Sequence, residues 1–352
     1  MKFDWNKIKA LPWARIGLIA LCVFLSLVLI VMITATVYIE NIFSRIGRVT
    51  GEEETYPSEL ITQATLPSDF TGVTINPSDV TTAPGVSNII AHKDIVNIML
   101  VGQDRREGEN YRTRSDAMIL CTFNTKDYTI TMTSFMRDMY VQIPGYGGDK
   151  MNAAYAYGGM KLLRETMMAN FGVQVDAFVE VDFSGFKAVV NTLGGVDIYL
   201  TAAEANYMNT TAWDGLDYEG WTLTEGMNHL NGDQALAYSR IRYVGGTSDF
   251  GRTERQRKVL STILSSCKNM SWDTAYALLN NLLPLVATDM TNSEILGYAT
   301  QLFPLLSKGD LVTQRIPIDG SYQLTYVGAL DVVLPDLEVN REFLLNTLMP
   351  KN

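Results

Sequence analysis

An uncharged, mostly apolar run extends from Ile16 to Ile39, between Arg15 and Glu40. As an α-helix its 24 residues would be about 36 Å long, enough to cross the hydrocarbon core of a membrane with some tilt. The run is longer than the apolar part of a typical signal peptide, although the small residues at 34–36 leave cleavage open as an alternative. The sequence therefore predicts one transmembrane helix at 16–39.

The charges around this run predict its orientation. Four basic residues precede it against a single acidic one, namely Lys2, Lys7, Lys9 and Arg15 against Asp4. Because basic residues are retained on the cytoplasmic side, residues 1–15 are expected in the cytoplasm and everything after Glu40 outside. We therefore expect a single-pass cell-membrane protein of type II with an extracellular folded domain.

The next segment, 40–92, lacks the composition of a packed domain. Between Val49 and His92 there is no Lys or Arg, whereas Glu, Asp, Thr, Ser and Pro accumulate. Such a segment buries too little apolar surface to offset the entropy lost on ordering. It is predicted to be a flexible acidic stalk.

Overall composition excludes several classes of protein. With 28 basic and 38 acidic side chains and a formal charge of -10, the chain has no long basic face for nucleic acid. Its three scattered cysteines (Cys22, Cys121 and Cys267) are typical of packing residues, and two histidines are too few for a zinc site. No nucleophile elbow of the Gly-x-Ser-x-Gly type is present. A metal ion would have to be bound by carboxylates.

Residues 93–352 alternate between strand and helix patterns. Strands are predicted at 95–102, 117–123, 128–135, 177–183, 196–200 and 311–318. Helices are predicted at 152–170, 184–193, 231–238, 272–286, 293–306 and 340–348, with a further one beginning near Arg252. This alternation favours one α/β domain in which helices cover a mixed central sheet.

Arginines are concentrated between Tyr238 and Gln256. If the stretch is extended at Arg240 and Arg242, both side chains leave the same strand face. Arg252, Arg255 and Gln256 then begin an i, i+3, i+4 stripe that continues into apolar residues, so the inward face of this helix begins in arginine. A solvated charged face is the alternative, but guanidinium groups on an inward face are typical of a phosphate-binding site.

Aspartates lie where two neighbouring strands meet. Asp104 follows the strand at 95–102, and Asp116 precedes the next one. Two carboxylates beside phosphate oxygens suit Mg²⁺. Alternatively, both are turn residues neutralised by Arg106 and Arg114. Further weak candidates are Arg137-Asp138 at the end of a strand and Lys150 before a helix.

Taken together and in this order, these motifs resemble the LytR-CpsA-Psr family of cell-wall glycopolymer ligases. The resemblance extends from about Asp94 to Lys268 and is most specific in its last motif. The family usually has proline before its Arg-Asp pair, where this chain has Met136. The matching residues are Gly102-Gln103-Asp104 with Arg106, Arg114-Ser115-Asp116, Arg137-Asp138, Lys150 with Asn152-Ala153-Ala154, Asp182-Phe183 with Gly185-Phe186, Gly194-Gly195-Val196, Leu230-Asn231-Gly232 with Gln234-Ala235-Leu236, Tyr238, Arg240, Arg242 and Asp249-Phe250-Gly251-Arg252-Thr253-Glu254-Arg255-Gln256.

The resemblance implies roles for these residues. Asp104 and Asp116 would bind Mg²⁺ at the pyrophosphate of a polyprenyl-linked glycan, and the tail of the lipid would occupy an apolar tunnel. The residues implied to bind pyrophosphate are Arg106, Arg114, Arg137, Lys150, Arg240, Arg242, Arg252 and Gln256. The candidate catalytic residues are Arg137, Asp138, Asp249 and Arg252, and the general base is Asp249, Asp138 or a metal-bound carboxylate.

The function implied is transfer of a glycopolymer from a polyprenyl-pyrophosphate carrier to a sugar hydroxyl of peptidoglycan. One alternative is a pyrophosphatase that uses water in place of the sugar. Another is a non-catalytic lipid-binding or regulatory cell-wall protein, which would not need convergent metal-binding carboxylates. Methionines such as Met160, Met167 and Met168 are candidates either for lining a lipid tunnel or for ordinary core.

Overall fold

The computed structural model describes residues 34, 37–48, 65–68, 70–80, 86, 88–103, 113–213, 215–245, 248–267 and 271–351. The chain divides into two units, residues 1–45 and 46–352. In the first unit residues 37–43 are helical, and among all described residues no helix has the length and hydropathy needed to cross a membrane. Most of the expected transmembrane segment, 16–39, lies outside the described residues, so the anchor and its topology stay predictions.

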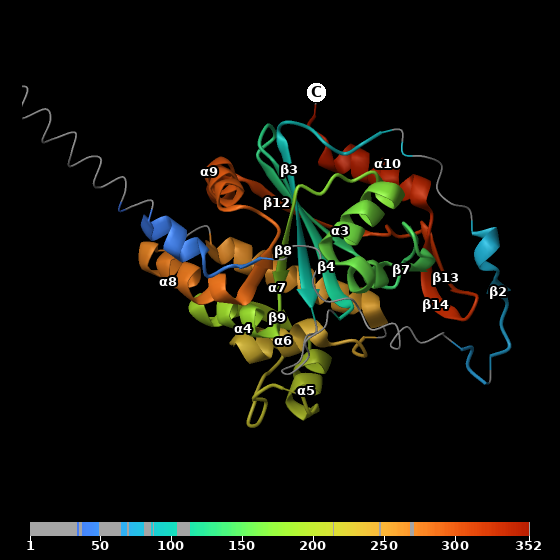
Figure 1. Cartoon of the computed structure of the whole chain (residues 1–352). Helices are drawn as coiled ribbons and strands as arrows, with labels where there is room; N and C mark the ends of the chain where they lie inside the picture. The colour runs from blue at the N-terminus through green and yellow to red at the C-terminus, as the bar shows by residue number, and fades with distance from the viewer. Residues whose placement is uncertain are drawn as a thin grey trace, which may run out of the picture. The chain divides into compact units, whose positions relative to one another are not determined.

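The second unit is built around a mixed sheet, as the sequence predicted. Within the described residues the sheet has seven strands in the order β1-β11-β8-β3-β4-β5-β12 (Figure 1). β3, β4 and β5 form an antiparallel meander, whereas β8 and β12 run parallel to their neighbours β3 and β5. The strands are β1 (Gly47–Arg48), β3 (Ile95–Gln103), β4 (Ser115–Asn124), β5 (Thr129–Phe135), β8 (Ala177–Val181), β11 (Val286–Thr288) and β12 (Asp310–Ile316).

Helices cover both faces of this sheet because successive side chains of a strand point to opposite faces. Along β4, Met118 and Leu120 join the core beneath α3 (Met151–Phe171) and α10 (Leu337–Leu348). Ile119 and Cys121 join the core beneath α7 (Ser248–Cys267) and α9 (Asn292–Lys308). Figure 1 shows α3 and α9 on opposite sides of the sheet. Burial raises the pKa of the Cys121 thiol to about 12, which suits the packing role expected for it.

A second group of elements packs around the first half of α7. The elements in this group are α4 (Phe183–Thr192), β9 (Val196–Leu200), α5 (Ala202–Thr210), β10 (Gly226–Leu230) and α6 (Gly232–Arg240). α8 (Trp272–Leu282) packs against α4, and η3 (Leu283–Leu285) follows it. The core of the group includes Val190, Ile198, Trp213 and Val259. Both α5 and α6 begin with capping boxes, Thr201 with Glu204 and Asn231 with Gln234. These fix where each helix begins.

A third group lies beside the end of β5. It contains β2 (Thr74–Ile75), η2 (Pro77–Asp79), β6 (Tyr140–Ile143), β7 (Gly147–Lys150), β13 (Tyr322–Val327) and β14 (Leu330–Pro335). β13 pairs with both β14 and β2, and Tyr140 of β6 packs against Val327 and Val332.

Parts of the predicted stalk belong to this folded unit. The β2 residue Ile75 accepts a hydrogen bond from Gly328 N at 2.8 Å, and the ring of Phe70 lies 4.6 Å from that of Tyr326. Ile90 is 1% exposed and its N–H donates to Gly172 O. The expectation of an unpacked stalk is wrong for these segments, because isolated apolar residues in the polar stretch pair with and pack on the domain.

Candidate functional site

Asp116 lies at a β-bulge. Across β3 and β4, Gly102 pairs with Ala117 but Gln103 pairs with Ser115, so Asp116 is the extra residue. A bulge interrupts the alternation of a strand and redirects a side chain. Asp116 consequently lines a cavity on the α7 side of the sheet.

Arg137 and Asp138 follow the end of β5. The preceding Met136 is fully buried, and its N–H donates to Ile316 O of β12 at 3.0 Å. Proline, the usual family residue here, has no N–H and could not make this bond. Methionine therefore extends the pairing of β5 with β12 and leaves the Arg-Asp pair at the end of the strand.

Lys150 ends β7 and precedes α3. It is the N-cap residue of this helix but makes no side-chain capping bond, and its Nζ instead lies 3.1 Å from Asp138 Oδ1. The β6–β7 hairpin thus delivers Lys150 to the Arg-Asp pair.

Arg240 and Arg242 do not lie on a strand, contrary to the sequence-based expectation. α6 begins at Gly232, close to the predicted start, but continues two residues beyond the predicted end, through Arg240, whose charge is favourable in a last turn. Ile241 is extended and fully buried, and Arg242 follows in the connection to α7. Both arginines nevertheless line the cavity, and Arg240 Cζ lies 5.1 Å from the centre of the Phe183 ring.

Asp249, rather than an arginine, is in the first turn of α7. The helix begins at Ser248, which places Arg252 one turn further in than predicted. The carboxylate of Asp249 suits the positive end of the helix dipole and contacts Arg252 Nη2. Arg252 is only 3% exposed, and its Nε and Nη1 have no hydrogen-bond partner.

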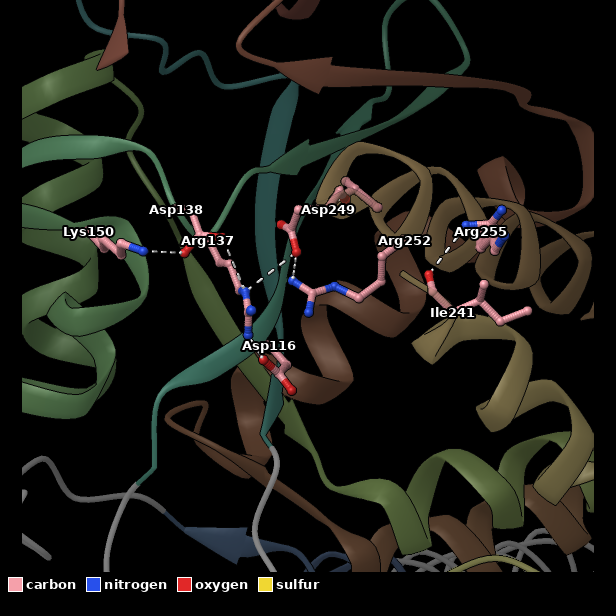
Figure 2. A network of polar contacts seen from close by, with 9 residues as sticks. Asp116, Arg137, Asp138, Lys150, Ile241, Asp249, Arg252 and Arg255 are labelled. Carbon is pink, nitrogen blue, oxygen red and sulfur yellow. Dashed lines mark hydrogen bonds and ion pairs between the residues drawn. The ribbon is translucent and has the colours of Figure 1, made fainter. Parts of the chain in front are cut away.

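Carboxylates and cations alternate through the site. Lys150 contacts Asp138, Asp138 and Asp249 each lie 3.6 Å from Arg137 Nε, and Asp249 contacts Arg252. Arg137 Nη1 also contacts Asp116. Figure 2 shows these side chains converging from the ends of β4, β5 and β7 and the start of α7. The structure thus brings together six of the candidate site residues, namely Asp116, Arg137, Asp138, Lys150, Asp249 and Arg252.

Burial and charge shift the pKa values of three groups in this network. Burial raises the pKa of the Asp249 carboxyl, only partly opposed by the charges of Arg252 and Arg137. Burial likewise lowers the pKa of Arg252. For Arg137 burial acts in the same lowering direction, but Asp116, Asp249 and Asp138 outweigh it and raise the pKa of its guanidinium. Asp249 is thus easier to protonate than an ordinary carboxylate, and Arg137 stays charged.

The cavity beside this network encloses about 420 Å³ and has a polar side and an apolar side. The residues that contribute polar groups are Asp116, Asp182, Ser239, Arg240, Arg242, Arg252 and Gln256. The apolar wall consists of Leu100, Ile119, Val181, Phe183, Phe186, Val189, Trp213, Leu236, Leu260 and Ile263. An elongated apolar ligand with an anionic head group matches both sides.

Several residues of this apolar wall were missed from the sequence. Phe183 and Trp213 line the cavity, whereas Met160 and Met167 belong to the core on the α3 side of the sheet. The tunnel-lining alternative for these two methionines is therefore wrong. A signal for Phe183 was present, because it directly follows the N-cap residue Asp182 and so begins α4 at the cavity.

Arg255 has a different role from Arg252. It is 8% exposed, and its Nε donates to Glu204 Oε1 at 2.7 Å. Its Nη1 and Nη2 donate to the carbonyl oxygens of Ile241 and Val244, each at 3.3 Å. Arg255 therefore binds the connection that carries Arg242 and does not line the cavity (Figure 2).

The remaining predicted residues are not placed in the network. Asp104 and Arg106 lie outside the described residues. Arg114 precedes β4, is not among the cavity-lining residues, and has a buried Nε without a hydrogen-bond partner. Within the described part of the chain, no three His, Cys, Asp or Glu residues form a metal-binding group. Asp116 and Asp182 both line the cavity, and Asp182 Oδ1 accepts a hydrogen bond from Gly185 N at 2.8 Å as the N-cap of α4. The carboxylate of Asp116 would fit Mg²⁺, which takes few protein ligands alongside phosphate oxygens.

Comparison with known proteins shows similarity in sequence to teichoic acid transferases. The polyisoprenyl-teichoic acid–peptidoglycan teichoic acid transferase TagU of Bacillus licheniformis is 37% identical over 188 residues, which are 53% of this chain and 57% of that protein. The aligned region thus spans little more than half of this relative.

Solved structures extend the likeness to the fold. A structure of TagT bound to LIIa-WTA has a TM-score of 0.58 and 30% identity, covering 79% of this chain and 99% of that one. YwtF (TagT) with bound octaprenyl pyrophosphate lipid has a TM-score of 0.52 and 27% identity, again over 79% of this chain and 99% of that one.

A family model shows how much of the chain is related to known proteins. The model of the LytR_cpsA_psr family matches residues 66–336, a range that contains every described residue of the charged network and the cavity beside it. It also reaches back into the segment that pairs with β13. This chain accordingly belongs to the LytR-CpsA-Psr family.

Proposed function

We propose that this protein transfers a glycopolymer from a polyprenyl-pyrophosphate carrier to a sugar hydroxyl of peptidoglycan. The observation that carries the proposal is that an apolar wall and the side chains of Arg240, Arg242, Arg252 and Gln256 line the same cavity. A prenyl chain is apolar and a pyrophosphate is a compact polyanion, so one lipid would satisfy both sides. The names of the TagU and TagT relatives support the same substrates.

The reaction follows from the position of the charges. The acceptor hydroxyl oxygen attacks the phosphorus atom next to the glycopolymer, and a new P–O bond forms. The anhydride bond to the second phosphate breaks, and its electron pair leaves with polyprenyl monophosphate. Guanidinium groups positioned before the reaction stabilise the charge that grows on this leaving phosphate. Arg252 is suited to this role because it is buried and two of its nitrogens have no partner.

The proton of the acceptor hydroxyl needs a base. We assign this role to Asp249, since burial raises the pKa of its carboxyl towards the working pH. Its Oδ2 is buried without a hydrogen-bond partner, and so has a free lone pair. Asp138 is bound by Lys150 at 3.1 Å and lies 3.6 Å from Arg137, which makes it the less available carboxylate.

Magnesium is part of the proposal. Asp116, together with Asp104, would bind Mg²⁺ beside the pyrophosphate, where the ion supplies positive charge to the phosphate oxygens. Arg137 binds Asp116 and would hold this carboxylate toward the cavity. The helix at 16–39 would keep the domain outside the cell membrane and near the lipid carrier.

The experiment that tests the proposal separates transfer from hydrolysis. Full-length protein is incubated with a polyprenyl-pyrophosphate-linked glycopolymer and Mg²⁺, with and without peptidoglycan fragments, and the products are identified by mass spectrometry. A phosphodiester-linked polymer–peptidoglycan product is expected. Release of free phosphorylated polymer at the same rate in both reactions would identify a pyrophosphatase, and unchanged donor lipid would indicate a non-catalytic lipid-binding protein.

A further inference from the structure

A second cavity is lined by residues next to the charged network. It encloses about 540 Å³ among β6, β13, β14, the start of α10 and the segment that contains η2. It shares no lining residue with the first cavity. Nothing in the reaction above uses it.

Three contacts connect this cavity to the catalytic carboxylates. Leu334 lines it and follows Val333, whose N–H donates to Asp138 O at 2.9 Å. Tyr140 lines it and pairs across β6 and β7 with Lys150, the partner of Asp138.

The third contact reaches Asp249. Tyr322 lines the cavity and stacks on Phe250, with 5.1 Å between ring centres, and Phe250 directly follows Asp249. The network therefore adjoins two separate cavities, an arrangement that suits an enzyme that joins two substrates.

The side chains of the second cavity exclude an anionic occupant. Three carboxylates line it, those of Asp79, Asp336 and Glu338, and none of its described lining residues is Lys, Arg or His. A phosphate-rich polymer would be repelled by this charge.

The same lining suits an uncharged sugar. Carboxylate and amide oxygens accept bonds from hydroxyl groups, and the side chains of Gln142 and Gln323 donate. The half-buried ring of Tyr322 offers rigid apolar surface next to these polar groups, as a sugar ring requires.

We propose that this cavity binds the uncharged glycan backbone of the acceptor peptidoglycan. The proposal rests on the function assigned above and adds the site of its second substrate. Donor lipid and acceptor glycan would reach Asp249 and Arg137 from separate cavities. The segment with β2 and η2 completes the acceptor site, because Ile75, Asp79 and Val80 form one of its walls.

Gln142→Ala and Glu338→Gln test the proposal. The side chain of Gln142 is in no hydrogen bond, while the backbone of this residue is bound by Asn170, so the substitution leaves β6 in place. Glu342→Gln is the matched control, since Glu342 lies one turn beyond Glu338 on α10, is exposed and does not line the cavity.

Calorimetry with full-length protein and a β-1,4-linked oligosaccharide of N-acetylglucosamine, the uncharged sugar of the peptidoglycan backbone, measures acceptor binding without any reaction. Each test variant is expected to raise the Kd roughly fivefold to tenfold, as loss of one hydrogen bond predicts, whereas Glu342→Gln keeps it. The KM for acceptor should rise in parallel, with donor-induced thermal stabilisation unchanged. Glycan binding that is equal in all four proteins overturns the acceptor site, whereas glycan binding without any transfer product overturns only the proposed reaction.

Discussion

Arg255 and Glu204 form an ion pair within the second group of elements, with 2.7 Å between Nε and Oε1 and both side chains less than a tenth exposed. Glu204 also closes the capping box at the start of α5. Arg255 in turn holds the carbonyl groups of Ile241 and Val244. One buried pair thus joins α5, α7 and the connection that carries Arg242.

Arg255→Met is predicted to lower the free energy of unfolding by about 3 to 5 kcal/mol, since it leaves the buried Glu204 carboxylate without its partner. Chemical denaturation measures the change. Glu204→Gln keeps a polar side chain in place and should lower the free energy less. An Arg255→Met protein with wild-type stability would show that the pair is not structural.

Arg252→Met, unlike Arg255→Met, is predicted to change the transfer rate and donor binding. Loss of one buried guanidinium should slow transfer on the order of a hundredfold, about 3 kcal/mol of transition-state stabilisation. Arg252→Lys should recover only part of this, because a point charge does not reproduce a planar fork. Transfer rates and donor-induced shifts of Tm measure the effect.

The control for Arg252→Met is Lys161→Met, which removes one positive charge from an exposed position on α3. It should leave both measurements unchanged. A donor lipid that stabilises Arg252→Met as much as the wild type would contradict the phosphate-binding role.

The contrast between Arg252 and Arg255 shows how much of the site could be predicted from the sequence. The helical stripe correctly placed both on an inward face, but periodicity does not reveal which partners face that side of the helix. Arg255 faces α5, whose capping box with Glu204 had not been recognised as a helix start. The distinction between a ligand-binding and a structural arginine depends on this contact, 51 residues apart in the chain.

Arg240 and Arg242 show a second limit. A spacing of two predicted a shared strand face, yet α6 ends between them, and both still reach the cavity. Apolar runs predicted β3, β4, β5 and β8 because both faces of these strands are largely buried, and β12 was predicted as well. β1 and β11 of the same sheet were not predicted. The short strands β2, β6, β7, β13 and β14 lack that signal, since tertiary pairing alone defines them.

Asp116→Asn is predicted to abolish the response to magnesium. With inorganic pyrophosphate present, Mg²⁺ should raise the Tm of the wild-type protein, and Asp116→Asn and Asp104→Asn should each remove this increase, because Mg²⁺ needs anionic oxygen ligands. Asp310→Asn, at an exposed position at the start of β12, is the matched control. An undiminished Mg²⁺ response in the Asp116→Asn protein would exclude this carboxylate as a ligand.

The raised pKa of Asp249 predicts how the transfer rate depends on pH. This pKa is raised chiefly by burial, so the transfer rate should fall with decreasing pH at a higher value than for an ordinary aspartate, as the base becomes protonated. Arg252→Met removes a charge that lowers this pKa and should move the acid limb of the rate profile to still higher pH. Pre-steady-state rates measured across the acid limb would test both statements.

Asp249 also makes the free energy of unfolding depend on pH. The direction is opposite to that for an ion-paired carboxylate, whose pKa is lowered by folding. Because the folded-state pKa of Asp249 lies above the unfolded value, the folded protein binds the proton more readily. The stabilisation from this proton is therefore fully present below the ordinary pKa of aspartate and is lost as the pH rises through the raised pKa. Asp249→Asn should remove this pH-dependent contribution. The difference in unfolding free energy between variant and wild type should therefore change with pH between the ordinary pKa of aspartate and the raised pKa of Asp249, and be constant outside this range. A difference that is constant throughout would show that Asp249 titrates normally and would remove the basis for assigning it as the base.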